Sequence, residues 1–123
     1  MRFDTLNEWL VWQESCHSSE IELGLERVGA VARTMGLTLD RSKVITVAGT
    51  NGKGSTVAVL NTLLRSAGYS VACFTSPHFL RYNERIKLDD CDVSDQLLID
   101  SFDRIDQARG TIPLTFFEFG TLA

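Results

Sequence analysis

The sequence predicts an α/β fold built around a doubly wound, mostly parallel sheet. Residues 43–48 form a short β-branched and apolar run, which is typical of a strand buried on both faces. A glycine-rich loop follows, then a helical pattern over residues 55–67 and a second apolar run over residues 70–75. Strand, loop, helix and strand in this order form a βαβ unit with a right-handed crossover. The sheet should therefore hold these two strands in parallel.

Two helices are predicted ahead of the first strand. In residues 4–14, Asp4 is the expected N-cap and the apolar positions recur at helical spacing: Leu6, Trp9, Leu10 and Trp12. The second helix is marked by Leu25, Val28, Ala32 and Met35, and Gly36 falls where a left-handed C-terminal cap belongs. Residues 15–24 read as the connector between them.

The second half of the chain predicts a strand and two more helices. Residues 84–90 alternate in polarity as a half-exposed strand or a hairpin arm would. Ser94 can cap a helix that runs to about residue 108 and ends at Gly110. Thr115 and Glu118 have the spacing of a capping box. We expect the helix that starts there to leave an apolar face uncovered, formed by Phe117, Phe119 and Leu122.

The composition is that of a globular protein with one core. The 123 residues are 44% hydrophobic, with mean hydropathy +0.01, a net charge of -4 and a pI near 5.1. This acidic balance argues against a surface built for nucleic acid or for an anionic membrane. Three widely spaced cysteines, no apolar run of about 18 residues and an acidic N-terminus predict a reduced cytoplasmic protein without an anchor.

The loop after the first predicted strand, GTNGKGST over residues 49–56, differs from the usual phosphate-binding pattern. Val47 and Gly54 stand where that pattern has Gly and Ser or Thr. The position between a strand and a helix still places backbone N–H groups and the positive helix end at one point, which suits a phosphate. Lys53 would add a charge, and Ser55 or Thr56 a hydroxyl for phosphate or Mg²⁺. The alternative is a tight turn with a solvated lysine.

Residues 49–55 resemble the ATP loop of the Mur ligase superfamily, and Gly54 resembles its folate branch. Four further phrases agree with this branch: IELGLERV (21–28), TSPH (75–78), RYNERI (81–86) and LTFFEFGTLA (114–123). The chain thus resembles the bacterial bifunctional dihydrofolate and folylpolyglutamate synthases. The resemblance implies a ligase that uses ATP to activate a carboxylate of dihydropteroate or folate as an acyl phosphate, and then joins it to L-glutamate.

The resemblance also implies a domain organisation. Residues 1–123 would be the N-terminal part of a P-loop-type, Mur-ligase-like ATPase domain that is incomplete at its C-terminal end, with the glutamate-ligase domain absent. The chain alone is therefore expected to be inactive, and the full-length protein to be a monomer. Its partners would be small molecules only: ATP with Mg²⁺, dihydropteroate or folate, and L-glutamate.

The resemblance assigns roles to individual residues. Lys53 would stabilise the transferring phosphoryl group, and Ser76 would ligate Mg²⁺. The ATP site would comprise Gly49, Thr50, Asn51, Gly52, Lys53, Gly54, Ser55 and Thr56. Substrate contacts would come from Ser15, Cys16, His17, Ser18, Thr115, Phe116, Phe117 and Glu118. Arg85 is a further candidate on its charge, because a carboxylated ligand needs local positive charge in an acidic protein. Without the resemblance, these segments read as a plain connector, a Ser-Pro turn, a solvated strand face and a capped helix start with core phenylalanines.

Three other functions stay open on the sequence. A small-molecule kinase or GTPase is expected to have Ser or Thr at position 54, where this chain has Gly. A cell-wall Mur ligase shares the loop but is not expected to carry the phrases at 21–28 and 81–86. The third alternative is a fragment that binds nucleotide without catalysis.

Overall fold

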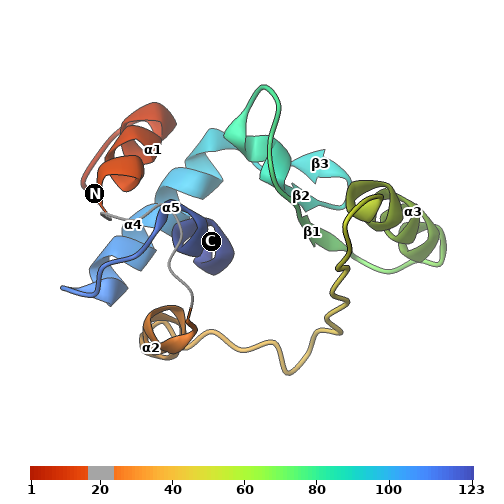
Figure 1. The fold of residues 1–123 in the computed structure, drawn as a ribbon, viewed down its shortest axis with the longest axis horizontal. Coiled ribbons are helices and arrows are strands. Elements are labelled where there is room, and N and C mark those ends of the chain that lie inside the picture. Colours follow the sequence, from red (N-terminus) through yellow and green to blue (C-terminus); the bar gives the residue numbers. More distant parts are fainter. Residues whose placement is uncertain (17–23) are drawn as a thin grey trace. The chain divides into compact units, whose positions relative to one another are not determined.

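The computed structural model describes residues 1–16 and 24–123, which form two compact units (Figure 1). Unit 1 comprises Met1–Thr38 and Asp95–Ala123, and unit 2 comprises Leu39–Ser94. Unit 1 is built from helices, whereas unit 2 combines a helix with a small sheet. The predicted α/β class is confirmed, in that the chain contains both helices and a sheet.

In residues 1–16, 24–38 and 95–123, unit 1 contains four helices: α1 (Leu6–Ser15), α2 (Glu26–Thr34), α4 (Asp95–Arg109) and α5 (Phe116–Leu122). The N-cap of α1 is Thr5 rather than the predicted Asp4. Glu8 lies three residues after Thr5, so the two residues form a capping box. The Glu8 N–H donates to Thr5 Oγ1 at 3.3 Å, and the Thr5 N–H donates to the Glu8 carboxylate at 3.0 Å. The predicted left-handed cap after α2 is confirmed, since Gly36 has φ of 66°.

Aromatic rings form the core of unit 1. Phe102 of α4 is fully buried and lies 6.1 Å from the ring of Trp9 and 6.2 Å from that of Phe119. Because α5 packs against α1, α2 and α4, both Phe119 and Leu122 are buried. The expectation of an uncovered face was therefore wrong for these two residues. Phe117, the third residue of the predicted face, is 50% exposed, as expected.

Unit 2 contains α3 (Lys53–Ser66), β1 (Ala72–Phe74), the 3₁₀ helix η1 (Tyr82–Arg85), β2 (Ile86–Leu88) and β3 (Cys91–Asp92). The sheet has the order β1-β2-β3, and both pairs are antiparallel. The tight turn between β2 and β3 is made by Asp89 and Asp90, with positive φ of 48° and 73°. The predicted hairpin arm is confirmed, although it begins as η1.

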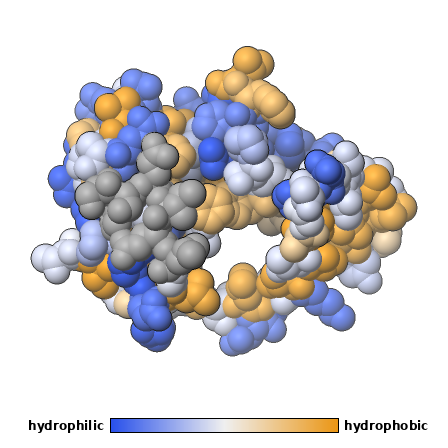
Figure 2. Space-filling model, viewed as in Figure 1, coloured by the Kyte–Doolittle hydropathy of each residue, from blue (hydrophilic) through white to orange (hydrophobic). Residues whose placement is uncertain are grey.

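The first predicted strand is absent from the described residues of unit 2, and so is the parallel pair. Residues 43–48 are assigned no strand, and β1 is paired antiparallel with β2. A strand exists only where its backbone hydrogen-bonds to a neighbour, and residues 43–48 have no such ladder here. Val44 and Ile45 consequently remain 64% and 57% exposed. Figure 2 shows apolar surface of this kind on unit 2.

Truncating the core of unit 1 should be costly. Phe102→Ala should lower the free energy of unfolding by about 3–5 kcal/mol, because it leaves a cavity between Trp9 and Phe119. Phe117→Ala, which removes a half-exposed ring of the same size, should cost less than about 1 kcal/mol. Urea unfolding followed by tryptophan fluorescence measures both, and equal losses in the two variants would contradict this core.

Candidate functional site

The start of α3 presents unsatisfied backbone donors. Its N-cap, Gly52, adopts a left-handed conformation with φ of 77° and has no side chain to cap the helix. The first helical hydrogen bond runs from the Thr56 N–H to the Gly52 carbonyl at 2.9 Å. The N–H groups of Lys53, Gly54 and Ser55 therefore have no acceptor within the helix and add to its positive end. This arrangement suits a bound anion.

The side chain of Lys53 folds back onto the loop that precedes it. Its Nζ donates to the Gly49 carbonyl at 2.6 Å and lies 3.4 Å from the Thr50 carbonyl. The Thr56 hydroxyl donates to the Gly52 carbonyl at 2.9 Å. All eight residues of the predicted ATP loop, 49–56, are exposed. The structure thus keeps the loop accessible, with the lysine ammonium held by the loop's own carbonyls.

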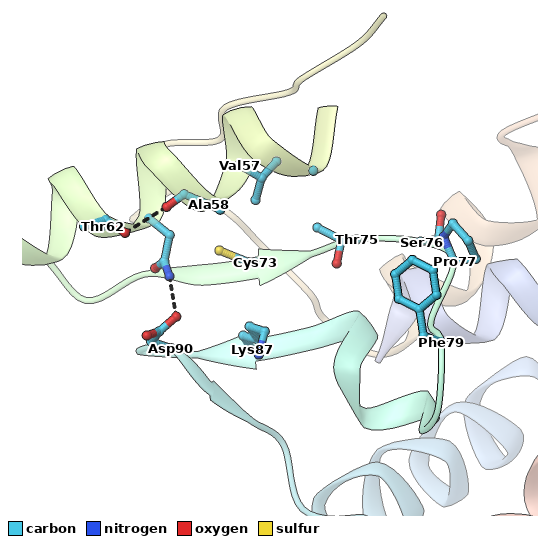
Figure 3. Close-up of a pocket in the computed structure, with 12 residues that line it drawn as sticks. Val57, Ala58, Thr62, Cys73, Thr75, Ser76, Pro77, Phe79, Lys87 and Asp90 are labelled. Atoms are coloured by element: carbon cyan, nitrogen blue, oxygen red, sulfur yellow. Dashed lines mark hydrogen bonds between the residues drawn. The ribbon is translucent and has the colours of Figure 1, made fainter. Parts of the chain in front are cut away.

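A cavity of about 420 Å³ lies between α3 and the sheet of unit 2 (Figure 3). Gly54, from the start of α3, and Ser76, from the loop after β1, both line it. The apolar part of the lining comes from Val57, Ala58, Cys73, Pro77 and Phe79, and the polar part from Asn61, Thr62, Thr75, Ser76, Lys87 and Asp90. Two segments that the sequence linked to phosphate and to Mg²⁺ therefore face one cavity.

The polar wall of this cavity was missed by the sequence analysis. Asn61 is only 6% exposed and donates from Nδ2 to the Asp90 carboxylate at 2.9 Å. Its position four residues after Val57 puts it on the same helical stripe, so a polar residue there was a usable signal. Lys87 is paired with Asp92, and that hydrogen bond raises the pKa of the lysine.

The loop after β1 is tied to η1 through Arg85. The Arg85 Nε donates to His78 Nδ1 at 2.8 Å, and its guanidinium lies 5.4 Å from the ring centroid of Tyr82. Burial of Tyr82 raises the pKa of its phenol to about 12. The nearby positive charge of Arg85 has a smaller, opposite effect on this pKa. One donor of Arg85 is thus engaged with the loop, and its contact with a substrate stays a prediction.

The predicted substrate contacts near α1 are only partly described. The Ser15 hydroxyl donates to the Trp12 carbonyl at 2.7 Å. Cys16 is half-buried, and burial raises the pKa of its thiol. His17 and Ser18 lie outside the described residues.

The predicted contacts at the start of α5 belong to unit 1 as well. Thr115 and Glu118 form the expected capping box, in which the Thr115 N–H donates to the Glu118 carboxylate at 2.8 Å. The other carboxylate oxygen of Glu118 accepts from Arg27 Nη2 at 2.9 Å. Phe116 is half-buried, and the half-exposed Phe117 has ring area available to a ligand. The structure therefore gives Glu118 a structural role beside any substrate contact.

Residues 1–16 and 24–123 contain neither a metal-binding cluster nor a membrane-spanning helix. No group of three or more His, Cys, Asp or Glu side chains in these ranges is arranged to hold a metal ion. No helix in them is both long enough and apolar enough to span a membrane.

Comparison with known proteins identifies the relatives of this chain. No protein-family model matches it. It is 46% identical over 118 residues, 96% of the chain, to the dihydrofolate synthase/folylpolyglutamate synthase of Escherichia coli (strain K12), and 45% identical to that of Haemophilus influenzae. The chain is a homologue of these synthases. It spans about 28% of the length of the E. coli relative and 27% of the other.

Solved structures agree with the sequence comparison. The E. coli synthase in complex with DHPP and ADP matches 97% of this chain with a TM-score of 0.92, at 46% identity. The Yersinia pestis synthase complexed with AMPPNP and Mn ion matches with a TM-score of 0.89 at 48% identity. Folylpolyglutamate synthetase from Lactobacillus casei matches with 0.85 at 26% identity. This chain covers 29%, 29% and 32% of those three chains.

The glycines of the loop should respond differently to alanine. Gly52→Ala should destabilise unit 2 by about 1 kcal/mol, because its φ of 77° disfavours a side chain. Gly54→Ala should leave the stability unchanged or raise it by up to about 1 kcal/mol, because α3 is helical there and a Cβ would meet no atom within 4 Å. Thermal unfolding of both variants tests this, and destabilisation by Gly54→Ala would contradict the described start of α3.

Tyr82 should make unit 2 sensitive to alkaline pH. Its folded pKa of about 12 lies above the ordinary value of 10.0, so its stabilising effect is complete below pH 10 and is lost as the pH rises to 12. The loss should amount to roughly 2–3 kcal/mol. Urea unfolding between pH 9 and 12 should show a flatter profile for Tyr82→Phe than for the parent, while Tyr69→Phe, at an exposed position, should follow the parent.

Proposed function

We propose that this chain carries part of an ATP-dependent ligase that adds L-glutamate to dihydropteroate, to reduced folates or to both. The observation that carries the proposal is the cavity of unit 2, which the start of α3 and Ser76 line together. The relatives support it, because they are named as dihydrofolate synthase/folylpolyglutamate synthase. Structures of such synthases hold ADP with DHPP, or AMPPNP with Mn and L-glutamate.

The proposed reaction makes an amide from a carboxylate and an amine. The carboxylate oxygen of the pteroate or folate attacks the γ-phosphorus of ATP, which gives an acyl phosphate and releases ADP. The amino group of L-glutamate then attacks the acyl carbon, the amine loses a proton, and inorganic phosphate leaves. The protein contributes chiefly by orienting the reactants and stabilising the charge of the transferring group.

The residues of the ATP loop have separate tasks in this reaction. The free N–H groups at the start of α3 bind phosphate oxygens, with Gly49, Thr50, Asn51 and Gly52 shaping the loop and the hydroxyls of Ser55 and Thr56 beside it. Lys53 exchanges its contacts with the loop carbonyls for the transferring phosphoryl group. For the remaining substrate contacts we propose Arg85 and, as a separate set, Ser15, Cys16, His17, Ser18, Thr115, Phe116, Phe117 and Glu118.

The donors around Ser76 fit Mg²⁺ in part. Mg²⁺ prefers oxygen ligands and keeps several waters, so one hydroxyl together with nucleotide phosphates is a suitable set. The described residues offer no cluster of acidic ligands, which makes Ser76 a single contributor. The ion would neutralise charge on the β- and γ-phosphates.

We also propose that residues 43–48 form a strand of a doubly wound, P-loop-type parallel sheet. The exposed Val44 and Ile45 and the lack of a partner in unit 2 support this, because a parallel strand needs neighbours and two covered faces. Residues 1–123 would then belong to the ATP-binding domain, and the longer relatives leave room for a glutamate-ligase domain. We place the whole protein in the cytoplasm as a monomer.

Lys53→Ala tests the role of the loop. The suitable protein is the E. coli synthase with its matching region replaced by this chain, because the relatives are longer. ADP release with dihydropteroate and L-glutamate should fall by roughly 10²-fold or more, since a charge aimed at the transferring phosphoryl group is lost. Lys43→Ala, in the same unit but outside the loop, is the matched control and should stay within about twofold.

Two results would count against the proposal. Near-normal ADP release in Lys53→Ala would remove the catalytic role of the lysine. Binding of ATP without any glutamate-dependent ADP release would favour the non-catalytic alternative.

A further inference from the structure

The loop that carries Ser76 is not held in place by hydrophobic burial. It joins β1 to η1, and its two large apolar side chains, Phe79 and Leu80, are each 90% exposed. Burial of such side chains normally supplies the largest stabilising contribution of a segment. Hydrogen bonds must therefore determine the conformation of this loop.

A single carboxylate binds three successive backbone N–H groups of the loop. The Phe79 N–H donates to Glu84 Oε2 at 2.9 Å, and the N–H groups of Leu80 and Arg81 donate to Glu84 Oε1 at 2.9 and 2.7 Å. Hydrogen bonds to an ionised acceptor are shorter and stronger than those between neutral groups. In agreement, these backbone donors lower the pKa of Glu84. Glu84 thus fixes residues 79–81 onto η1.

The other end of the loop is fixed by Arg85. The Thr75 N–H donates to the Arg85 carbonyl at 2.8 Å, which continues the pairing of β1 with β2. The Arg85 Nε donates to His78 Nδ1 at 2.8 Å. Ser76 therefore lies between fixed points on both sides, at Thr75 and at residues 78–81.

We propose that Glu84 is a positioning residue that sets the place of the Ser76 hydroxyl at the cavity of unit 2. It touches neither nucleotide nor metal, and it acts by holding the loop backbone through three N–H groups. This inference rests on the proposed function, because it takes Ser76 as a ligand of Mg²⁺. Loosening the loop should therefore raise the Mg²⁺ concentration that the reaction needs, while kcat at saturating Mg²⁺ changes little.

Glu84→Gln is the primary test, made in the chimeric synthase that carries this chain. Glutamine keeps the size of the side chain but replaces one acceptor oxygen by an NH₂ group, which cannot accept from the loop. The Mg²⁺ concentration for half-maximal ADP release should rise about 5- to 10-fold, and so should the Mg²⁺ concentration for half-maximal binding of a non-hydrolysable ATP analogue. The kcat at saturating Mg²⁺ should stay within about twofold, which a general loss of folding would not allow.

Asp100→Asn is the matched control. It removes a carboxylate charge from an exposed pair with Gln96 in α4, and neither residue lines the cavity of unit 2. Its Mg²⁺ dependence should be that of the parent. Glu84→Asp keeps the charge but shortens the reach, so its shift should lie between those of the parent and Glu84→Gln.

Ser76→Ala and the double variant Ser76→Ala/Glu84→Gln distinguish the positioning role of Glu84 from the metal-binding role of Ser76. If Glu84 acts through Ser76, the double variant should shift the Mg²⁺ dependence no further than Ser76→Ala alone. Additive shifts would overturn the inference. A shift in Ser76→Ala with none in Glu84→Gln would also overturn it and leave the proposed function intact. No shift in Ser76→Ala would reject the metal role of Ser76, and with it this inference, whereas Lys53→Ala still tests the ligase itself.

Discussion

Backbone N–H groups that lack an acceptor are the constraint on which the site in unit 2 depends. At the start of α3 the cap residue is glycine, so the first donors of the helix stay open and an anion can bind them. In the loop after β1, by contrast, three backbone N–H groups do have an acceptor, the carboxylate of Glu84. The same chemistry thus leaves one segment ready for a ligand and makes the other rigid enough to present a side chain beside it.

The two units differ in how much apolar side-chain surface they bury. Unit 1 closes its own aromatic core, in which α5 is covered by three other helices. Unit 2 buries few large side chains, and Val59 and Leu63 of α3 are as open as Val44 and Ile45. A helix with such side chains in water gains little from the hydrophobic effect. Hydrogen bonds such as that between Asn61 and Asp90 therefore have a larger share in holding unit 2 together.

Local signals in the sequence were sufficient for the helices, the hairpin and the glycine caps. Capping residues, helical spacing and turn residues act within a few positions, so a single segment contains all the information. The strand at residues 43–48 could not be established in this way, because pairing depends on a neighbour elsewhere in the chain. The covering of Phe119 is likewise tertiary, because it depends on α1, α2 and α4. The sequence motifs pointed to the loop at residues 49–56 and to Ser76. The part that Asn61 plays in lining the cavity could be recognised only from the fold.

The contact of Lys53 with the loop carbonyls has a consequence for how ligand affinity is interpreted. In the free protein the ammonium already has oxygen acceptors, at Gly49 and Thr50. An arriving phosphate must compete with them, so the binding energy attributed to this lysine is the difference between two sets of hydrogen bonds. The loop carbonyls released in that exchange must find water or a metal-bound water instead.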